Sequence, residues 1–464
     1  TNGQRYGIHP FIVQIRSLVD HSSLPGITLG DIGPKFGYNT TDNGFLRFDR
    51  FRVPREAMLM RYAQVDMQGH YTRPPHPKLN YLTMVKVRSG LLYSSGVYLA
   101  MACCIAIRYS AVRQQGYHPG ENPTEVPENT ILNYQLQAYR LTTQLANAFA
   151  FWIAGKQQTE LFEYLNSQIE IGELDLLAEV HATVSCLKAF STWACADGIE
   201  ECRKSCGGHG YLRVSGLPDL FARAVPMCTF EGDNYVLIQQ TIRYQLKQLQ
   251  KHRLHPLAAI PASFDYILDL ESFAMQQLVI DEPLQWLDPL LHETILKHRA
   301  IRLLVELHAQ LEALQDQGRS DAEAWNDLQS EFVRVARAHG FLVIARTFSS
   351  CVTNVPDIEL RAVLRDVYNV FILRHIEDNV SEFMEDGFMN GIHSREIRVI
   401  VRDLIANLRP NLVPLVDSFN FSDSKLWYSV LGRYDGQVYS ALYETTKKDA
   451  RNASDVTPAY KYIQ

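Results

Sequence analysis

Three long stretches of helical sequence dominate the middle of this 464-residue chain and limit what it can fold into. Residues 81–115, 131–168 and 174–206 contain few helix breakers, and apolar residues recur in them at helical spacing, as at Val180, Val184 and Leu187. A shorter helical stretch follows at about 234–251. Because such helices bury their apolar faces against one another, four helices packed antiparallel is the simplest arrangement. The sequence therefore predicts a mainly α fold that contains a four-helix bundle.

The segments on either side of these helices have a different texture. Short β-prone runs occur at 11–15 and 45–48, and the Asn43-Gly44 pair before the second run is a strong turn signal. Beyond Pro256 the chain is rich in loops to about Pro289 and then helical almost to its end. We therefore expect a partial, β-barrel-like domain, a linker, a helical domain and a second, C-terminal helical domain, at residues 1–62, 63–80, 81–255 and 256–464 respectively.

Composition argues against several classes of function. The formal net charge is −6, and no block of Lys or Arg suits a nucleic-acid backbone, so we expect no nucleic-acid role. Of the eight cysteines, Cys202 and Cys206 are one helical turn apart, and no paired CxxC or Cys/His cluster follows. We expect reduced, mostly buried thiols in an intracellular protein and no metal site. No segment is expected to have the length and apolarity of a membrane span.

A glycine-rich segment ends the third long helix. In Ser205-Cys206-Gly207-Gly208-His209-Gly210-Tyr211 the glycines allow a ligand to approach the backbone, and they leave N–H groups free to meet an anion such as a diphosphate. The alternative interpretation is a simple C-terminal cap that stops the helix.

A second segment places a carboxylate directly before a helix. In Cys228-Thr229-Phe230-Glu231-Gly232-Asp233-Asn234 the carboxylate of Glu231 stands between an aromatic residue and a glycine. Partial desolvation there would suit a general base. Asp233 and Asn234 are good N-caps, so a capping turn with a solvated glutamate is the alternative.

Both segments resemble the acyl-CoA dehydrogenase and oxidase superfamily in sequence and in spacing. Further runs share this resemblance over essentially the whole chain, and they are most similar to peroxisomal acyl-CoA oxidases, in particular the plant long-chain type. These runs are Gly7–His9 with Phe11–Gln14, Leu29–Lys35, Asp42–Leu46, Val53–Arg55, Cys104–Arg113, Ala196–Lys204 and Leu431–Gly436.

The resemblance implies a peroxisomal, FAD-dependent enzyme of fatty acid β-oxidation. Members bind FAD between a β domain and a four-helix domain, usually across a homodimer. They convert fatty acyl-CoA to trans-2-enoyl-CoA, and in the oxidases O2 is reduced to H2O2. By the same resemblance, the family's amino-terminal helical domain and the first part of its β domain are missing from this sequence, so we expect it to be one piece of a longer protein. Residues 460–464 are not a Ser-Lys-Leu type signal, so the expected location rests on the resemblance alone.

The resemblance also assigns roles to individual residues. Glu231 matches the base that removes the α proton of the substrate. Arg113 matches the arginine that meets the FAD diphosphate from the neighbouring subunit, as the forked guanidinium suits phosphate oxygens. The remaining cofactor-binding residues implied are Gly207, Gly208, Asp233, Asn234 and Gln135.

Two other functions remain open from the sequence. One is an acyl-CoA dehydrogenase of the same fold that passes electrons to an electron-transfer flavoprotein. The other is a catalytically silent helical scaffold. The oxidase interpretation rests on the 200 or so residues after Pro256, which resemble the second helical domain of peroxisomal oxidases.

Overall fold

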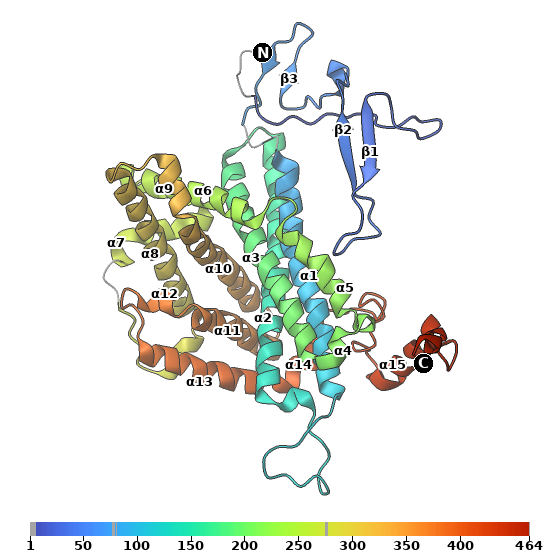
Figure 1. The fold of residues 1–464 in the computed structure, drawn as a ribbon. Helices are drawn as coiled ribbons and strands as arrows, with labels where there is room; N and C mark the ends of the chain where they lie inside the picture. The colour runs from blue at the N-terminus through green and yellow to red at the C-terminus, as the bar shows by residue number, and fades with distance from the viewer. Residues whose placement is uncertain (1–5, 77–78, 80, 274–276, 464) are drawn as a thin grey trace.

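The computed structural model describes residues 6–76, 79, 81–273 and 277–463. Their fold is mainly α, as predicted, and Figure 1 shows two packed groups of helices with a small β part at one end. The central group contains the four long helices expected from the sequence. They are α1 (Leu82–Val112), α2 (Gln135–Glu170), α3 (Asp175–Ser205) and α6 (Asn234–Leu254).

The glycine-rich segment after α3 corrects one detail of the sequence analysis. Its glycines end α3 at Ser205, but the segment then forms a short helix of its own, α4 (Gly207–Tyr211), followed by α5 (Leu217–Ala224). Gly207 turns the chain with a φ of 58°, which a side chain would resist. Residues 117–129, between α1 and α2, contain neither helix nor strand.

The second layer of helices covers one side of α2. There α10 packs on α8, α11 packs on α13, and both α10 and α11 lie against α2. The helices after α6 are α7 (Leu270–Phe273), α8 (Pro289–Asp316), α9 (Asp321–Asp327), α10 (Gln329–Thr353), α11 (Ile358–Asp378), α12 (Ser381–Met384), α13 (Gly391–Leu408), α14 (Leu412–Asp417) and α15 (Val438–Lys447). Short 3-10 helices lie at Arg55–Ala57, Ile131–Asn133, Arg213–Ser215, Val225–Cys228, Ala262–Asp269, Pro283–Leu287, Arg409–Asn411, Ala450–Asn452 and Pro458–Tyr462.

The β part is smaller than the sequence predicted. β1 (Ile27–Asp31) pairs antiparallel with β2 (Gly44–Phe48), and β3 (Gln64–Val65) pairs with β4 (Tyr71–Thr72) inside the expected linker. The predicted strand at 11–15 is wrong. It forms an isolated bridge from Phe11 to Met58, because no strand of the described chain lies along it. Residues 77–78 and 80 of the expected linker lie outside the described residues.

One apolar core extends through both layers, and helix α1 packs in it against α2, α3, α5 and α14. Residues Leu99–Ser110 are all buried. Its mean hydropathy reaches 1.8, so among the described helices it is the one long and apolar enough for a membrane span, which the sequence analysis did not expect. Because 72% of that window is buried inside the protein, α1 has the character of a core helix. All eight cysteines are free thiols and six of them are buried, as predicted.

Two glycines allow α1 and α2 to approach closely. A Cβ added to Gly96 would lie 2.4 Å from the backbone nitrogen of Trp152, and one added to Gly155 would lie 2.4 Å from the Cα of Tyr93. The two contacts are reciprocal, since each glycine faces the backbone of the other helix. No side chain fits at either position without separating the helices.

We therefore predict that Gly96→Val destabilises the protein. Overpacking of this kind costs about 1–3 kcal/mol and more where backbone must move, so the melting temperature should fall by several degrees. The control is Gly90→Ala on the same helix, where no atom lies within 4 Å of the added Cβ. It should keep or raise the melting temperature, since alanine favours helix by about 1 kcal/mol. Equal melting temperatures for wild type and Gly96→Val would contradict the close contact.

Buried neutral histidines in the second layer predict a loss of stability in mild acid. Burial lowers the pKa of His292 to about 4 and that of His339 to about 3. Below pH 6.5 the unfolded chain binds protons that the folded chain does not, so the free energy of unfolding falls as the pH falls towards 4. Each histidine contributes about 1.4 kcal/mol per pH unit in this range. Denaturant unfolding at a series of pH values should show a shallower slope for His339→Gln, and an unchanged slope would disprove the assignment.

Candidate active site

Glu231 lies in a tight turn between the 3-10 helix Val225–Cys228 and α6. Its φ is 57° and that of Gly232 is 108°, so two consecutive residues adopt the left-handed conformation. For a residue with a side chain this conformation costs about 1–2 kcal/mol, and other contacts must hold it. Asp233 caps α6 by accepting a hydrogen bond from the backbone N–H of Tyr235 at 3.0 Å. The half-buried carboxylate of Glu231 itself has no hydrogen-bond or ion-pair partner among the described residues.

Two buried cations bind the backbone of this turn. Nε of Arg88, on α1, donates to the carbonyl of Glu231 at 2.8 Å. Nζ of Lys188, on α3, donates to the carbonyl of Gly232 at 2.8 Å. Burial lowers the pKa of Lys188 to about 8. The sequence analysis identified neither cation, since each lies inside a helix far from the Glu231 segment in the sequence.

Asn234 points into the protein. Its Oδ1 accepts from Nζ of Lys188 at 2.9 Å, and its Nδ2 donates to Oγ1 of Thr192 and to the carbonyl of Ala189. The residue is 1% exposed. Its side chain is therefore occupied in holding the turn against α3.

The other predicted residues gather at the opposite end of α1. Arg113 follows the last residue of the helix, and its guanidinium donates to the hydroxyl of Tyr439 at 3.0 Å, which raises the pKa of Arg113. No carboxylate in the described part of the chain pairs with it. Gly207 and Gly208 are exposed, and a Cβ on either would meet no atom within 4 Å. His209, next to them, shares a hydrogen bond of 2.8 Å with Tyr109 of α1.

Gln135 is the first residue of α2 and is exposed at this same end. Two residues later, Nε2 of Gln137 donates to the carbonyl of Ser205 at 2.8 Å, which joins the start of α2 to the end of α3. Arg113, Gln135, Gly207 and Gly208 thus lie at the same end of the bundle, where the guanidinium of Arg113 is not paired with a carboxylate in the described part of the chain.

The predicted residues therefore form two separate groups. Arg88 and Arg113 are 25 residues apart, which corresponds to about 37 Å along the helix axis. The Glu231 turn lies beside Arg88, whereas the glycines lie near the Arg113 end. One chain does not bring its two groups together.

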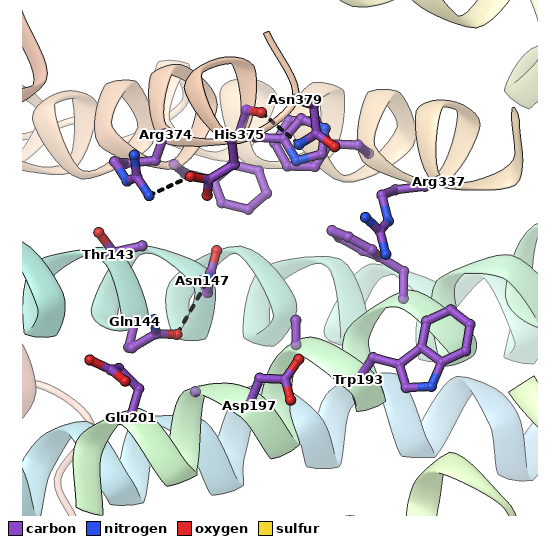
Figure 2. A pocket seen from close by; sticks show the side chains of 16 residues that line it. Thr143, Gln144, Asn147, Trp193, Asp197, Glu201, Arg337, Arg374, His375 and Asn379 are labelled. Carbon is purple, nitrogen blue, oxygen red and sulfur yellow. Dashed lines mark hydrogen bonds and ion pairs between the residues drawn. The ribbon is translucent and has the colours of Figure 1, made fainter. Parts of the chain in front are cut away.

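A polar cavity of about 490 Å³ lies elsewhere, between α2 and α3 on one side and α10 and α11 on the other (Figure 2). Arg374 on its wall pairs with Asp378 at 2.6 Å, and Glu201 pairs with Arg140. Burial keeps the pKa of His375 well below its usual value. None of the predicted site residues lines this cavity, and these ion pairs neutralise much of its wall charge.

Comparison with protein families identifies two matching segments. Residues 81–246 match the family model described as acyl-CoA oxidase, C-alpha1 domain, and residues 290–464 match that described as acyl-CoA oxidase. Among curated proteins, the chain is 42% identical to peroxisomal acyl-coenzyme A oxidase 1 of Cavia porcellus over 100% of this chain and 70% of that protein. It is 40% identical to putative peroxisomal acyl-coenzyme A oxidase 1.2 of Arabidopsis thaliana, covering 100% of this chain and 69% of the relative.

Solved structures give the same result. Acyl-CoA oxidase 1 of Arabidopsis thaliana superimposes with a TM-score of 0.91 at 38% identity, over 99% of this chain and 69% of that chain. Acyl-CoA oxidase-2 of Caenorhabditis elegans, bound with FAD, ascaroside-CoA and ATP, gives a TM-score of 0.92 at 34% identity, over 100% of this chain and 67% of that chain.

Proposed function

Because this chain belongs to the acyl-CoA oxidase family, we propose that Glu231 is the base that removes the α proton of its fatty acyl-CoA substrate. The family's reaction is the oxidation of fatty acyl-CoA to trans-2-enoyl-CoA, with O2 reduced to H2O2, and it is the first step of peroxisomal fatty acid β-oxidation. The chemistry that bound FAD would supply is acceptance of the β hydrogen as a hydride. The location in the peroxisome follows from the named relatives.

The unpaired carboxylate is the observation that supports this role. A proton next to a thioester is weakly acidic, so its removal needs a base that is held in place and not neutralised by a fixed partner. Glu231 has no such partner in the described structure, and the left-handed turn holds its backbone in one conformation. Arg88 and Lys188 hold that turn through its carbonyls and form no ion pair with the carboxylate.

The Arg113 end of α1 suits the diphosphate part of FAD. The guanidinium of Arg113 can donate two parallel hydrogen bonds to phosphate oxygens. The bare backbone of Gly207 and Gly208 allows close approach of a ligand, and Gln135 lies at the same end of the bundle. The residues present therefore fit a dinucleotide with a charged diphosphate.

The separation of the two groups supports a homodimer. About 37 Å along α1 is farther than one dinucleotide reaches between its flavin ring and its diphosphate. We propose that Glu231 acts on a substrate bound beside a flavin, and that the diphosphate of this flavin would be held by Arg113, Gly207 and Gly208 of the partner subunit. Residues 81–255 then carry both half-sites.

Glu231→Gln tests the role of the base. Glutamine keeps the shape of the side chain but cannot accept the α proton, so peroxide release from long-chain acyl-CoA should fall at least about a hundredfold. Absorbance of bound FAD should stay unchanged. The matched control is Glu173→Gln at an exposed turn, which should retain wild-type activity. Peroxide release by Glu231→Gln at the wild-type rate would refute the assignment.

Gly208→Val tests the proposed diphosphate-binding region independently of activity. The new side chain would enter open space beside Arg113, so we expect FAD to bind at least about tenfold more weakly, measured by quenching of flavin fluorescence. The melting temperature of the FAD-free protein should stay within a few degrees, because no protein atom lies within 4 Å of the added Cβ. Gly90→Ala serves as the control. Unchanged FAD affinity in Gly208→Val would exclude this region as the binding site of the FAD diphosphate.

A further inference from the structure

The turn that carries Glu231 is held from behind by positive charge. The carbonyl of Glu231 accepts from Arg88 and the carbonyl of Gly232 accepts from Lys188, both at 2.8 Å. The two cations come from different helices, α1 and α3, so the turn is fixed relative to both. Gly232 has no spare room, since an added Cβ would lie 2.8 Å from Leu237 and 3.1 Å from Nη2 of Arg88.

Lys188 is an unusual residue for its place in the structure. Its exposed fraction is 0%, whereas lysine is almost never fully buried unless it is paired. Its hydrogen-bond partners in the described chain are the neutral oxygens of Gly232 and Asn234. Neutral partners offset less of the desolvation cost than a carboxylate would, so stability alone gives no reason for a charge here.

The hydrogen bonds around Lys188 form a closed network. Asn234 accepts from Nζ of Lys188 and donates to Oγ1 of Thr192 at 2.9 Å, and Oγ1 of Thr192 donates to the carbonyl of Lys188 at 2.8 Å. All three side chains are at least 99% buried. The network holds the ammonium group of Lys188 in hydrogen-bond contact with the Gly232 carbonyl. It also holds the first residue of α6 against α3.

We propose that Lys188 is a positioning residue for the reaction and that it acts through Gly232 and Asn234 to hold the carboxylate of Glu231 at the substrate. Arg88 supports the same turn from α1. This proposal rests on the assignment of Glu231 as the base. The turn adopts its left-handed conformation with the help of charge-assisted hydrogen bonds, which are roughly twice as strong as neutral ones. Loss of the charge at Lys188 would let the turn relax and move the carboxylate away.

Charged and titratable groups face Lys188 from several elements. Burial is the main cause that lowers its pKa to about 8, and the positive charge of Arg88 acts in the same direction. Cys228, Asp233 and Glu231 act in the opposite direction. Lys188 is therefore protonated at neutral pH and loses its proton as the pH rises through about 8, which weakens its hold on the turn.

Lys188→Met in the FAD-loaded holoenzyme is the decisive test, with anaerobic flavin reduction by saturating long-chain acyl-CoA as the measurement. We expect the reduction rate to fall at least about tenfold, while acyl-CoA affinity and bound FAD stay within about threefold of wild type. The wild-type rate should fall as the pH rises through about 8, and Lys188→Met should lack this dependence. A purely structural role would lower the melting temperature but leave the rate per bound flavin unchanged.

Two further variants make the outcome unambiguous. Lys247→Met removes an exposed lysine and should reduce flavin at the wild-type rate. Thr192→Val keeps the shape of the side chain but removes the hydrogen bond to Asn234, and it should slow flavin reduction by about threefold. This variant tests the network even if Lys188→Met fails to fold. Wild-type rates in Thr192→Val, or in a folded Lys188→Met, would overturn the proposal.

The same assay separates this proposal from the one it rests on. If Glu231→Gln reduces flavin at the wild-type rate, Glu231 is not the base and the role of Lys188 fails with it. If Glu231→Gln is inactive while Lys188→Met and Thr192→Val keep wild-type rates, Glu231 remains the base and Lys188 alone is excluded.

Discussion

Burial of α1 between α2 and α3 is the constraint on which the rest of the structure depends. The helix is apolar on most of its surface and touches its neighbours over most of its length, so it can neither slide nor rotate without exposing core side chains. Gly96 and Gly155 fix its distance from α2. Since Arg88 and Arg113 stand at opposite ends of this rigid helix, the two halves of the proposed site have a fixed separation within one chain.

Buried cations have two different roles in this protein. Arg299 in the second layer is fully buried and pairs with Glu382, so its charge is neutralised by a carboxylate in the same layer. Lys188 in the first layer is equally buried but meets neutral oxygens that belong to the Glu231 turn. A buried ion pair is compatible with a purely structural role, whereas an ammonium group directed at backbone carbonyls fixes the conformation of the segment that supplies them. The contrast is the reason to assign a function to Lys188 and none to Arg299.

The helices could be predicted from the sequence because their periodicity is local. α1, α2, α3 and α6 all lie close to the predicted ranges, since apolar spacing and the absence of breakers decide where a long helix forms. The β part could not be predicted as well. Residues 11–15 have the composition of a strand, but a strand forms only when a second strand pairs with it. Which segment pairs with residues 11–15 is decided by the tertiary fold and not by their own sequence. The short helix α4 was missed because its three glycines argue against helix, although the surrounding packing of α3 and α5 favours it.

The candidate site residues also divide into those that a local sequence signal indicates and those that only the fold reveals. Glu231 and the glycines belong to short, distinctive segments, and the family resemblance identified them. Lys188 has no such signal, because the sequence does not distinguish a buried lysine in α3 from one that faces solvent. The fold shows that it is buried. The Gly232 carbonyl that it binds lies 44 residues later in the sequence. The role of Asn234 also depends on contacts between helices. The sequence indicates a good N-cap, but in the structure Asn234 is buried and its side chain joins Lys188 to Thr192. A candidate catalytic carboxylate can thus be proposed from sequence, while the groups proposed to orient it are defined by contacts between helices.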